Sequence, residues 1–289
     1  MRLIGKTNID FIGKRNIFYI FSLLVLISGI ISIYMKGLNL GLDFTGGTLL
    51  QIKFTQKMEI ANLREILRKG GIDANIRTFE DNSYAILIKG KQENVNEYAN
   101  KVIDVLNKNG AKFIEEKRDF VGPVVGKELT KKAVFAIVLS MFGIIVYIAF
   151  RFTNPIWGIT GVIALLHDVF IAITAMSITN RELDLVIVAA LLTIAGYSIN
   201  DTIVIYDRMR ENLKKYPKMA LKELINLSIN ETLSRTIITS ITVVMVLIVL
   251  YIFGGSAIND FAFCMLVGSI SGVYSTIAIA TSIGYEWQK

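Results

Sequence analysis

The chain has 289 residues, of which 53% are hydrophobic and only 19% are charged. Soluble globular domains contain about 45–50% apolar and about 25% charged residues, so this composition predicts a polytopic membrane protein and not a soluble enzyme. A single cysteine and a single histidine exclude an intrachain disulfide and multi-histidine metal sites, and we expect no metal and no cofactor. The formal net charge of +7 does not indicate nucleic-acid binding, because the basic residues cluster beside apolar runs, where membrane topology explains them.

The N-terminal region predicts a retained membrane span. Residues 1–16 are short and basic, so the positive-inside rule predicts a cytoplasmic N-terminus. Residues 17–35 contain no charge and are longer than the apolar region of a usual secretory signal. No small-residue cleavage site follows them, and we therefore interpret 17–35 as the first transmembrane helix.

The only long polar segment, residues 37–131, predicts a small domain outside the membrane. Apolar residues alternate in 48–54, as in a half-buried strand, and recur at helical spacing in 59–69 and 95–106. Further strands are expected over 72–79, 84–88 and 111–120. The resulting order, β-α-β-β-α-β, is the ferredoxin-like pattern, so we expect an α+β domain with its own core.

Five later apolar runs each approach the roughly 20 residues that a transmembrane helix needs. Within residues 133–285 they lie at about 133–150, 156–178, 185–206, 236–253 and 261–285. With the N-terminus inside, six spans place the C-terminus inside and make 207–235 a cytoplasmic loop, whose basic character agrees with the positive-inside rule. The predicted fold is therefore a membrane all-α bundle of six transmembrane helices with an inserted, extracytoplasmic, ferredoxin-like α+β domain.

Three polar groups interrupt the apolar runs: His167-Asp168 in the third span, Asn200-Asp201 in the fourth and Arg235 at the start of the fifth. An acidic side chain in lipid costs roughly 2.5–3.5 kcal/mol, and aspartate is too short to reach the interface easily. Because consecutive spans run in opposite directions, Asp201 and Arg235 lie at similar depth. We expect them to form an ion pair, since pairing relieves both desolvation costs.

Two interpretations of these residues stay open. In the functional one, Asp201 and Arg235, together with Asn200, carry a proton or another ion, and His167 and Asp168 are weaker candidates for a stepped path. In the structural one, Asp201 and Arg235 form a fixed ion pair, and His167 links helices by hydrogen bonds.

A glycine-rich stretch, Asp43-Phe-Thr-Gly-Gly47, precedes the first predicted strand. A binding loop is one interpretation. The favoured one is that Gly46 and Gly47 form a tight turn or bulge at the entry to the strand, with the Asp43 carboxylate bonded to local amides.

Four stretches taken together resemble the SecF family. They are GLDFTGGTLLQI after the first span, LLHDVFI in the third, GYSINDTIVIYDRMREN in the fourth and TLSRTIITSIT at the fifth. Members of this family are membrane subunits of the bacterial and archaeal Sec protein-export machinery and are related to resistance-nodulation-division transporters. The resemblance covers nearly the whole chain, in order.

The resemblance implies a function, partners and site residues. It implies half of a twelve-span assembly whose other half is SecD, and use of the proton-motive force to complete preprotein translocation. Asp201 matches the family's proton-linked aspartate, Arg235 its essential arginine, and His167-Asp168 its third-span pair. The implied partners are SecD, the SecY-SecE-SecG channel, SecA, YajC, YidC, the preprotein and membrane lipids, and the implied location is the cell membrane.

Other functions remain as alternatives to proton-driven export. One is a small-molecule or lipid exporter of the resistance-nodulation-division type, although a single modest external domain argues against a self-sufficient pump. The other is a passive translocase scaffold in which the polar residues are structural. The sequence lacks the G-x-x-x-x-G-K-[ST] signature of ATP binding, so an ion gradient is the expected energy source. It does not distinguish protons from sodium ions.

Overall fold

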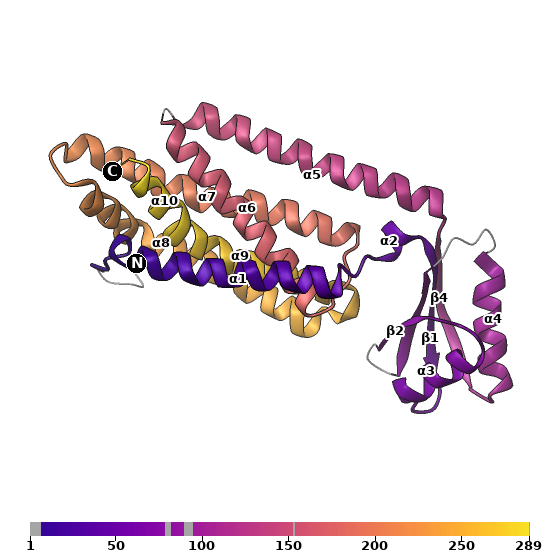
Figure 1. The fold of residues 1–289 in the computed structure, drawn as a ribbon. Helices are drawn as coiled ribbons and strands as arrows, with labels where there is room; N and C mark the ends of the chain where they lie inside the picture. The colour runs from indigo at the N-terminus through magenta and orange to yellow at the C-terminus, as the bar shows by residue number, and fades with distance from the viewer. Residues whose placement is uncertain (1–6, 79–81, 90–94, 153, 289) are drawn as a thin grey trace.

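The computed structural model describes residues 7–78, 82–89, 95–152 and 154–288. Long helices form a bundle, and a small domain of strands and short helices projects from one end of it (Figure 1). Within the described residues, six helical segments are long and apolar enough to cross a membrane. The predicted fold class, a six-helix membrane bundle with an inserted α+β domain, is confirmed.

The bundle is built from long helices with short connections between most of them. They are α1 (Arg15–Lys36), α5 (Pro123–Arg151), α6 (Pro155–Ile178), α7 (Leu185–Lys215), α8 (Leu221–Phe253) and α9 (Gly255–Ser275). A 3₁₀ turn, Ile12–Lys14, precedes α1. At the other end of the chain, α9 continues through a π-helical turn, Thr276–Ala280, into α10 (Thr281–Glu286).

Capping residues fix where two helices in the middle of the bundle begin. The Asn154 side chain accepts a hydrogen bond from the amide of Ile156, and a proline occupies the first position of α6. The Asp184 side chain accepts a hydrogen bond from the amide of Ile187 at the start of α7. Both caps satisfy backbone N–H groups that have no partner within their own helix.

The helices differ in how much of their apolar surface the bundle covers. In their most apolar windows, α6, α7 and the α9–α10 segment have 44%, 50% and 61% of the residues buried. The corresponding values for α1, α5 and α8 are 17%, 11% and 17%. Large apolar side chains therefore remain exposed on α1, α5 and α8, and these faces are suited to contact lipid or another membrane protein.

The inserted domain contains a four-stranded antiparallel sheet. Its elements are β1 (Gly47–Phe54), α3 (Ile60–Lys69), β2 (Asn75–Thr78), β3 (Ser83–Lys89), α4 (Val95–Lys108) and β4 (Phe113–Val121). The spatial strand order is β2-β3-β1-β4, and the element order agrees with the predicted β-α-β-β-α-β pattern. A core that includes Leu50, Leu63, Ile86 and Val102 joins the sheet to α3 and α4.

The predicted loop 207–235 is mostly helical in the structure. Helix α7 continues to Lys215 and α8 begins at Leu221, so only a short turn separates them. Hydropathy failed to reveal these extensions because it reports the membrane-spanning part of a helix and not where the helix ends. Polar contacts between the two extensions, such as Arg208 to Glu231, hold them side by side.

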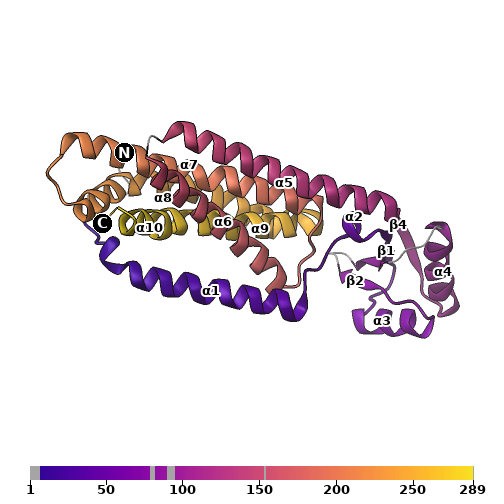
Figure 2. The same cartoon turned by 45° about the horizontal axis from the view of Figure 1, so that its top comes forward.

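Both chain termini lie at the end of the bundle that holds the α7–α8 turn, opposite the α/β domain (Figures 1 and 2). The segment that precedes α1 is attached to α8 there. Asn230 accepts a hydrogen bond from the Ile9 amide and donates one to the Ile9 carbonyl, both at 2.9 Å. The Asp10 carboxylate forms an ion pair with Lys222 at 2.8 Å. The N-terminal segment is thus packed as part of the bundle.

The α/β domain is joined to the bundle at the connection between α6 and α7. The Gly41 amide donates to the Leu183 carbonyl at 2.7 Å, which ties the segment after α1 to this connection. Arg77 on β2 forms an ion pair with Glu182 at 2.5 Å and lies 3.6 Å from Asp260 at the start of α9. Half-buried charged side chains therefore cross the boundary between domain and bundle.

Candidate functional site

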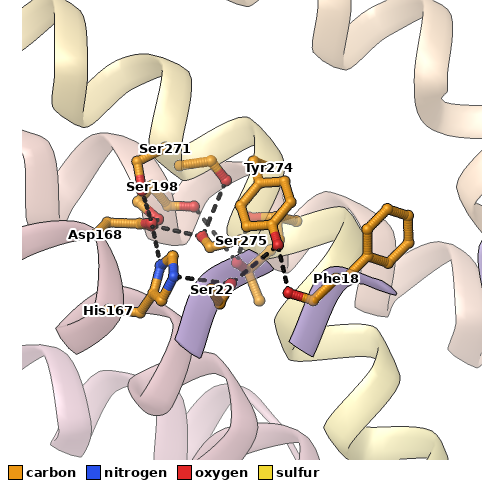
Figure 3. A network of polar contacts seen from close by, with 11 residues as sticks. Phe18, Ser22, His167, Asp168, Ser198, Ser271, Tyr274 and Ser275 are labelled. Atoms are coloured by element: carbon orange, nitrogen blue, oxygen red, sulfur yellow. Dashed lines mark hydrogen bonds and ion pairs between the residues drawn. The ribbon is translucent and has the colours of Figure 1, made fainter. Parts of the chain in front are cut away.

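A buried carboxylate, Asp168 on α6, lies at the centre of a polar network (Figure 3). Its side chain is inaccessible to solvent. Hydroxyl groups of Ser198 on α7 and of Ser271 and Ser275 on α9 each donate to it at 2.6 Å. The Nδ1 atom of His167 lies 3.2 Å from its Oδ1 atom. We call these five residues the Asp168 network.

The network extends to α1 through the other nitrogen of the imidazole ring (Figure 3). His167 Nε2 lies 3.2 Å from the Ser22 hydroxyl, which lies 2.9 Å from the Tyr274 hydroxyl. Tyr274 in turn donates to the Phe18 carbonyl at 2.8 Å. His167 thus lies between Asp168 and Ser22, with one ring nitrogen directed at each of them.

The geometry of the Asp168 network favours a structural role. Four donors surround the Asp168 carboxylate, so a proton that arrives there must displace one of them. The contacts join α1, α6, α7 and α9, four of the long helices of the bundle. They favour the interpretation of His167 as a hydrogen-bonded link between helices over that of a step in a proton path.

Asp201 on α7 has very different surroundings. It is only 5% exposed, and its Oδ2 atom is buried without a hydrogen-bond partner. The predicted ion pair with Arg235 is not formed: within the described residues Asp201 Oδ2 has no hydrogen-bond partner, and Arg235 acts on the carboxylate only through its charge. The Arg235 side chain is exposed on α8, and Asn200 is exposed beside Asp201. The two side chains have different surroundings, since Arg235 is exposed to solvent or lipid on α8 whereas Asp201 is buried on α7.

Polar contacts join α7 and α8 on either side of Asp201. They are Tyr197 with Ser240 at 3.2 Å, Arg208 with Glu231 at 2.6 Å, and Asn212 with Ser228 at 3.0 Å. We call this row of contacts the α7–α8 seam. Asp201 lies within the seam, and in the described part of the chain its buried Oδ2 atom has no hydrogen-bond partner.

The glycine-rich stretch forms a turn and also connects the α/β domain to the start of α7. Leu42–Thr45 is a single helical turn, α2, followed by Gly46 and Gly47 with φ of +66° and +137°, values that suit glycine. The Asp43 carboxylate accepts a hydrogen bond at 3.0 Å from the amide of Leu185, the first residue of α7. The predicted bond to local amides is therefore wrong, because a helix N-terminus far away in sequence offers unpaired N–H groups at this point.

Burial changes the pKa of Asp184, the acidic residue beside this connection. Asp184 caps α7 next to Asp43, and burial raises the pKa of its carboxyl group above the usual value. The hydrogen bond that the Asp184 carboxylate accepts from the Ile187 amide lowers this pKa, whereas the nearby negative charge of Asp43 raises it further. Two acids thus share the N-terminus of one helix.

Comparisons with known proteins identify the family. The family model described as SecD/SecF GG Motif matches residues 31–58, and the model described as Protein export membrane protein SecD/SecF, C-terminal, matches residues 101–289. The protein translocase subunit SecF of Calditerrivibrio nitroreducens is 42% identical over 97% of this chain and 94% of its own length. The chain belongs to the SecF family. The protein translocase subunit SecF of Thermodesulfovibrio yellowstonii is 40% identical over 98% of this chain.

Solved structures of SecDF have the same fold. The crystal structure of the translocon-associated membrane protein SecDF from Thermus thermophilus aligns with a TM-score of 0.89 and 33% identity over 100% of this chain. This chain covers 40% of that longer one. SecDF in a super-membrane-facing form aligns with a TM-score of 0.74 and 32% identity. The relatives are named as protein translocase subunits, which is a transport role.

Sequence analysis did not identify the serine hydroxyls that hydrogen-bond to Asp168 in the bundle. Serine is common in membrane helices, so the spacing of Ser271 and Ser275 alone does not single them out. Only the arrangement of helices brings these serines and Ser198 to the Asp168 carboxylate. Asp201 was found from sequence because a buried acid is conspicuous in an apolar run.

Proposed function

We propose that this SecF-family chain assists preprotein export through the Sec channel, together with SecD, and couples export to the proton-motive force at Asp201. The observation that supports the coupling role is the buried Asp201 carboxylate without a hydrogen-bond partner inside the α7–α8 seam. A carboxylate in such a place is costly when charged and much less so when neutral. Uptake and release of a proton there therefore changes the energy of the bundle.

The membrane potential supplies enough energy per proton to shift a conformational equilibrium. One charge that crosses 100 mV is worth about 2.3 kcal/mol, and about 1.4 kcal/mol is a tenfold change in an equilibrium. Each proton that passes Asp201 can thus bias two arrangements of the helices by more than tenfold. Arg235 is near enough for its positive charge to act on Asp201, although the two side chains do not touch. In this proposal they pair in another state of the cycle.

The proposed partners and orientation are those that the family implies, and the exposed apolar helix faces support contact with a membrane partner. In the proposal, SecD covers exposed apolar surface of the bundle, and the complex works beside the SecY-SecE-SecG channel after SecA has pushed the preprotein. YajC, YidC and membrane lipids are further proposed neighbours. Both termini are proposed to lie in the cytoplasm, with residues 37–131 on the opposite side of the cell membrane.

The decisive experiment measures preprotein export in inverted membrane vesicles with and without a proton gradient. We expect Asp201→Asn and Arg235→Met to lose gradient-stimulated export, by about tenfold or more, because the site no longer exchanges a proton. Asp104→Asn, the same chemical change at an exposed residue of α4, is the control and is expected to behave as wild type.

Two outcomes of this experiment contradict the proposal. Retention of gradient-stimulated export by both variants would leave the chain as a passive scaffold. Full stimulation of export by a sodium gradient, with no response to a proton gradient, would mean that Asp201 couples export to sodium ions and not to protons.

A further inference from the structure

The position of the α7–α8 seam that contains Asp201 lacks the polar contact between helices that the neighbouring positions have. The two helices run antiparallel, and their contacts follow one another in regular order along both. Asp201 comes one helical turn after Tyr197 on α7, and Thr236 comes one turn before Ser240 on α8. Because Tyr197 contacts Ser240, the next position along the seam places Asp201 opposite Thr236.

Both side chains at this position contain a buried polar atom without a partner. Asp201 is 5% exposed and Thr236 only 1% exposed. Among the residues that the structure describes, neither Asp201 Oδ2 nor Thr236 Oγ1 has a hydrogen-bond partner. Buried polar atoms without partners are rare, so two on facing helices at the same level point to one shared site.

The Thr236 hydroxyl is also unlike the other hydroxyls nearby on α8. Thr232, Thr239 and Ser240 each donate to the backbone carbonyl four residues earlier, at 2.9, 3.0 and 2.7 Å. This bond is the usual way in which a hydroxyl on a helix is satisfied. Thr236 makes no such bond, so its hydroxyl proton is available to another acceptor.

We infer that Thr236 is a positioning residue of the coupling site and forms a hydrogen bond with Asp201, directly or through one water molecule, as the carboxyl group gains and loses its proton. A hydroxyl group has one donor and two acceptor positions. It can therefore donate to the charged carboxylate and accept from the neutral carboxylic acid after rotation about its Cβ–Oγ bond. Threonine suits this task because it serves both protonation states without a charge of its own.

The inference rests on the proposed role of Asp201 and adds a residue to it. Arg235, the neighbour of Thr236 in sequence, is exposed on α8. Thr236 lies on the buried side and keeps the carboxyl group oriented while Arg235 is away. Without the hydroxyl, the charged form of Asp201 loses this donor.

Thr236→Val tests the inference, because valine has nearly the same shape and lacks the hydroxyl. We expect the pH of half-maximal gradient-driven export to move towards alkaline values by about one unit, the size of one hydrogen bond to a charged group. Thr236→Ser keeps the hydroxyl and is expected to retain the wild-type profile. Thr242→Val, the same change at an exposed threonine of α8, is the matched control.

Infrared spectroscopy of the purified complex with SecD gives a second readout that does not depend on transport. The carboxyl stretching band of protonated Asp201 is the band that disappears in Asp201→Asn. We expect this band to shift in Thr236→Val and in the smaller variant Thr236→Ala, and to stay in place in Thr236→Ser and Thr242→Val. Thr236→Ala keeps the test valid if valine disturbs folding.

The outcomes separate this inference from the proposed function. An unshifted band and an unchanged pH profile in Thr236→Val and Thr236→Ala overturn the inference. Gradient-stimulated export that survives Asp201→Asn overturns the proposed function instead, and a band shift in Thr236→Val then still establishes the contact.

Discussion

Asp168 and Asp201 show how two acids on neighbouring helices acquire different chemistry from their surroundings. Three serine hydroxyls and His167 Nδ1 surround Asp168. The buried Oδ2 atom of Asp201 has no hydrogen-bond partner among the described residues. A carboxylate with four donors stabilises one arrangement of helices, whereas a carboxylate without donors is sensitive to any charge or hydroxyl that approaches it.

We predict that Asp168→Asn destabilises the protein without altering its response to the proton gradient. The amide nitrogen cannot accept from the serine hydroxyls, and His167 loses its carboxylate partner inside the bundle. A cost of about 3 kcal/mol is expected for breaking such a buried network. Thermal unfolding of the purified complex measures it, and the pH profile of export by the folded fraction measures the second part.

Asp104→Asn again serves as the control for Asp168→Asn, since its side chain is exposed on α4. The opposite pattern, wild-type stability with loss of the gradient response, would show that the Asp168 network belongs to the proton path after all.

At the scale of elements, the extensions of α7 and α8 form a platform to which the N-terminal segment is attached. Asp10 receives hydrogen bonds from Lys222, from the Gly13 amide and from Asn226. These bonds lower the pKa of the Asp10 carboxyl group from 3.8 to about 2, with that from Lys222 the largest cause. The charged carboxylate is thus the form that holds the segment in place.

The segment is therefore predicted to loosen in acid. A lowered pKa in the attached state means that the contribution of Asp10 is complete above pH 3.8 and is lost as the pH falls towards 2. We expect faster hydrogen exchange of the Phe11, Ile12 and Gly13 amides in that range, and the same increase at neutral pH in Asp10→Asn. Glu65→Gln, which removes an exposed carboxylate paired with Lys69, is the control. Unchanged exchange in Asp10→Asn would contradict the prediction.

At the scale of the whole molecule, the sequence predicts the parts better than the contacts between them. The spans were predictable because their apolar runs match the membrane thickness, and the α/β domain because its periodicity switches between strand and helix. Asp201 was predictable as a buried acid. The partners of Asp168, the bond from Leu185 to Asp43 and the open position of Arg235 were not, because each depends on which helix faces lie together.

The joint between domain and bundle gives the last prediction. Arg77 contacts Glu182 and Asp260 with side chains that are 35%, 12% and 21% exposed. Single surface ion pairs contribute about 0–1 kcal/mol, but a half-buried group of three charges holds its geometry better. We therefore expect Arg77→Glu to release the α/β domain from the α6–α7 connection by charge repulsion.

Electron paramagnetic resonance distances between a spin label on α4 and one on the exposed end of α6 measure this release. We expect the distance distribution to broaden in Arg77→Glu and to narrow again, in part, when Glu182→Arg restores the opposite charges. Arg64→Glu, which reverses a charge on α3, is the control for the change in net charge. A distribution that stays narrow in Arg77→Glu would mean that the backbone bonds at Leu183 hold the domain without help from the ion pairs.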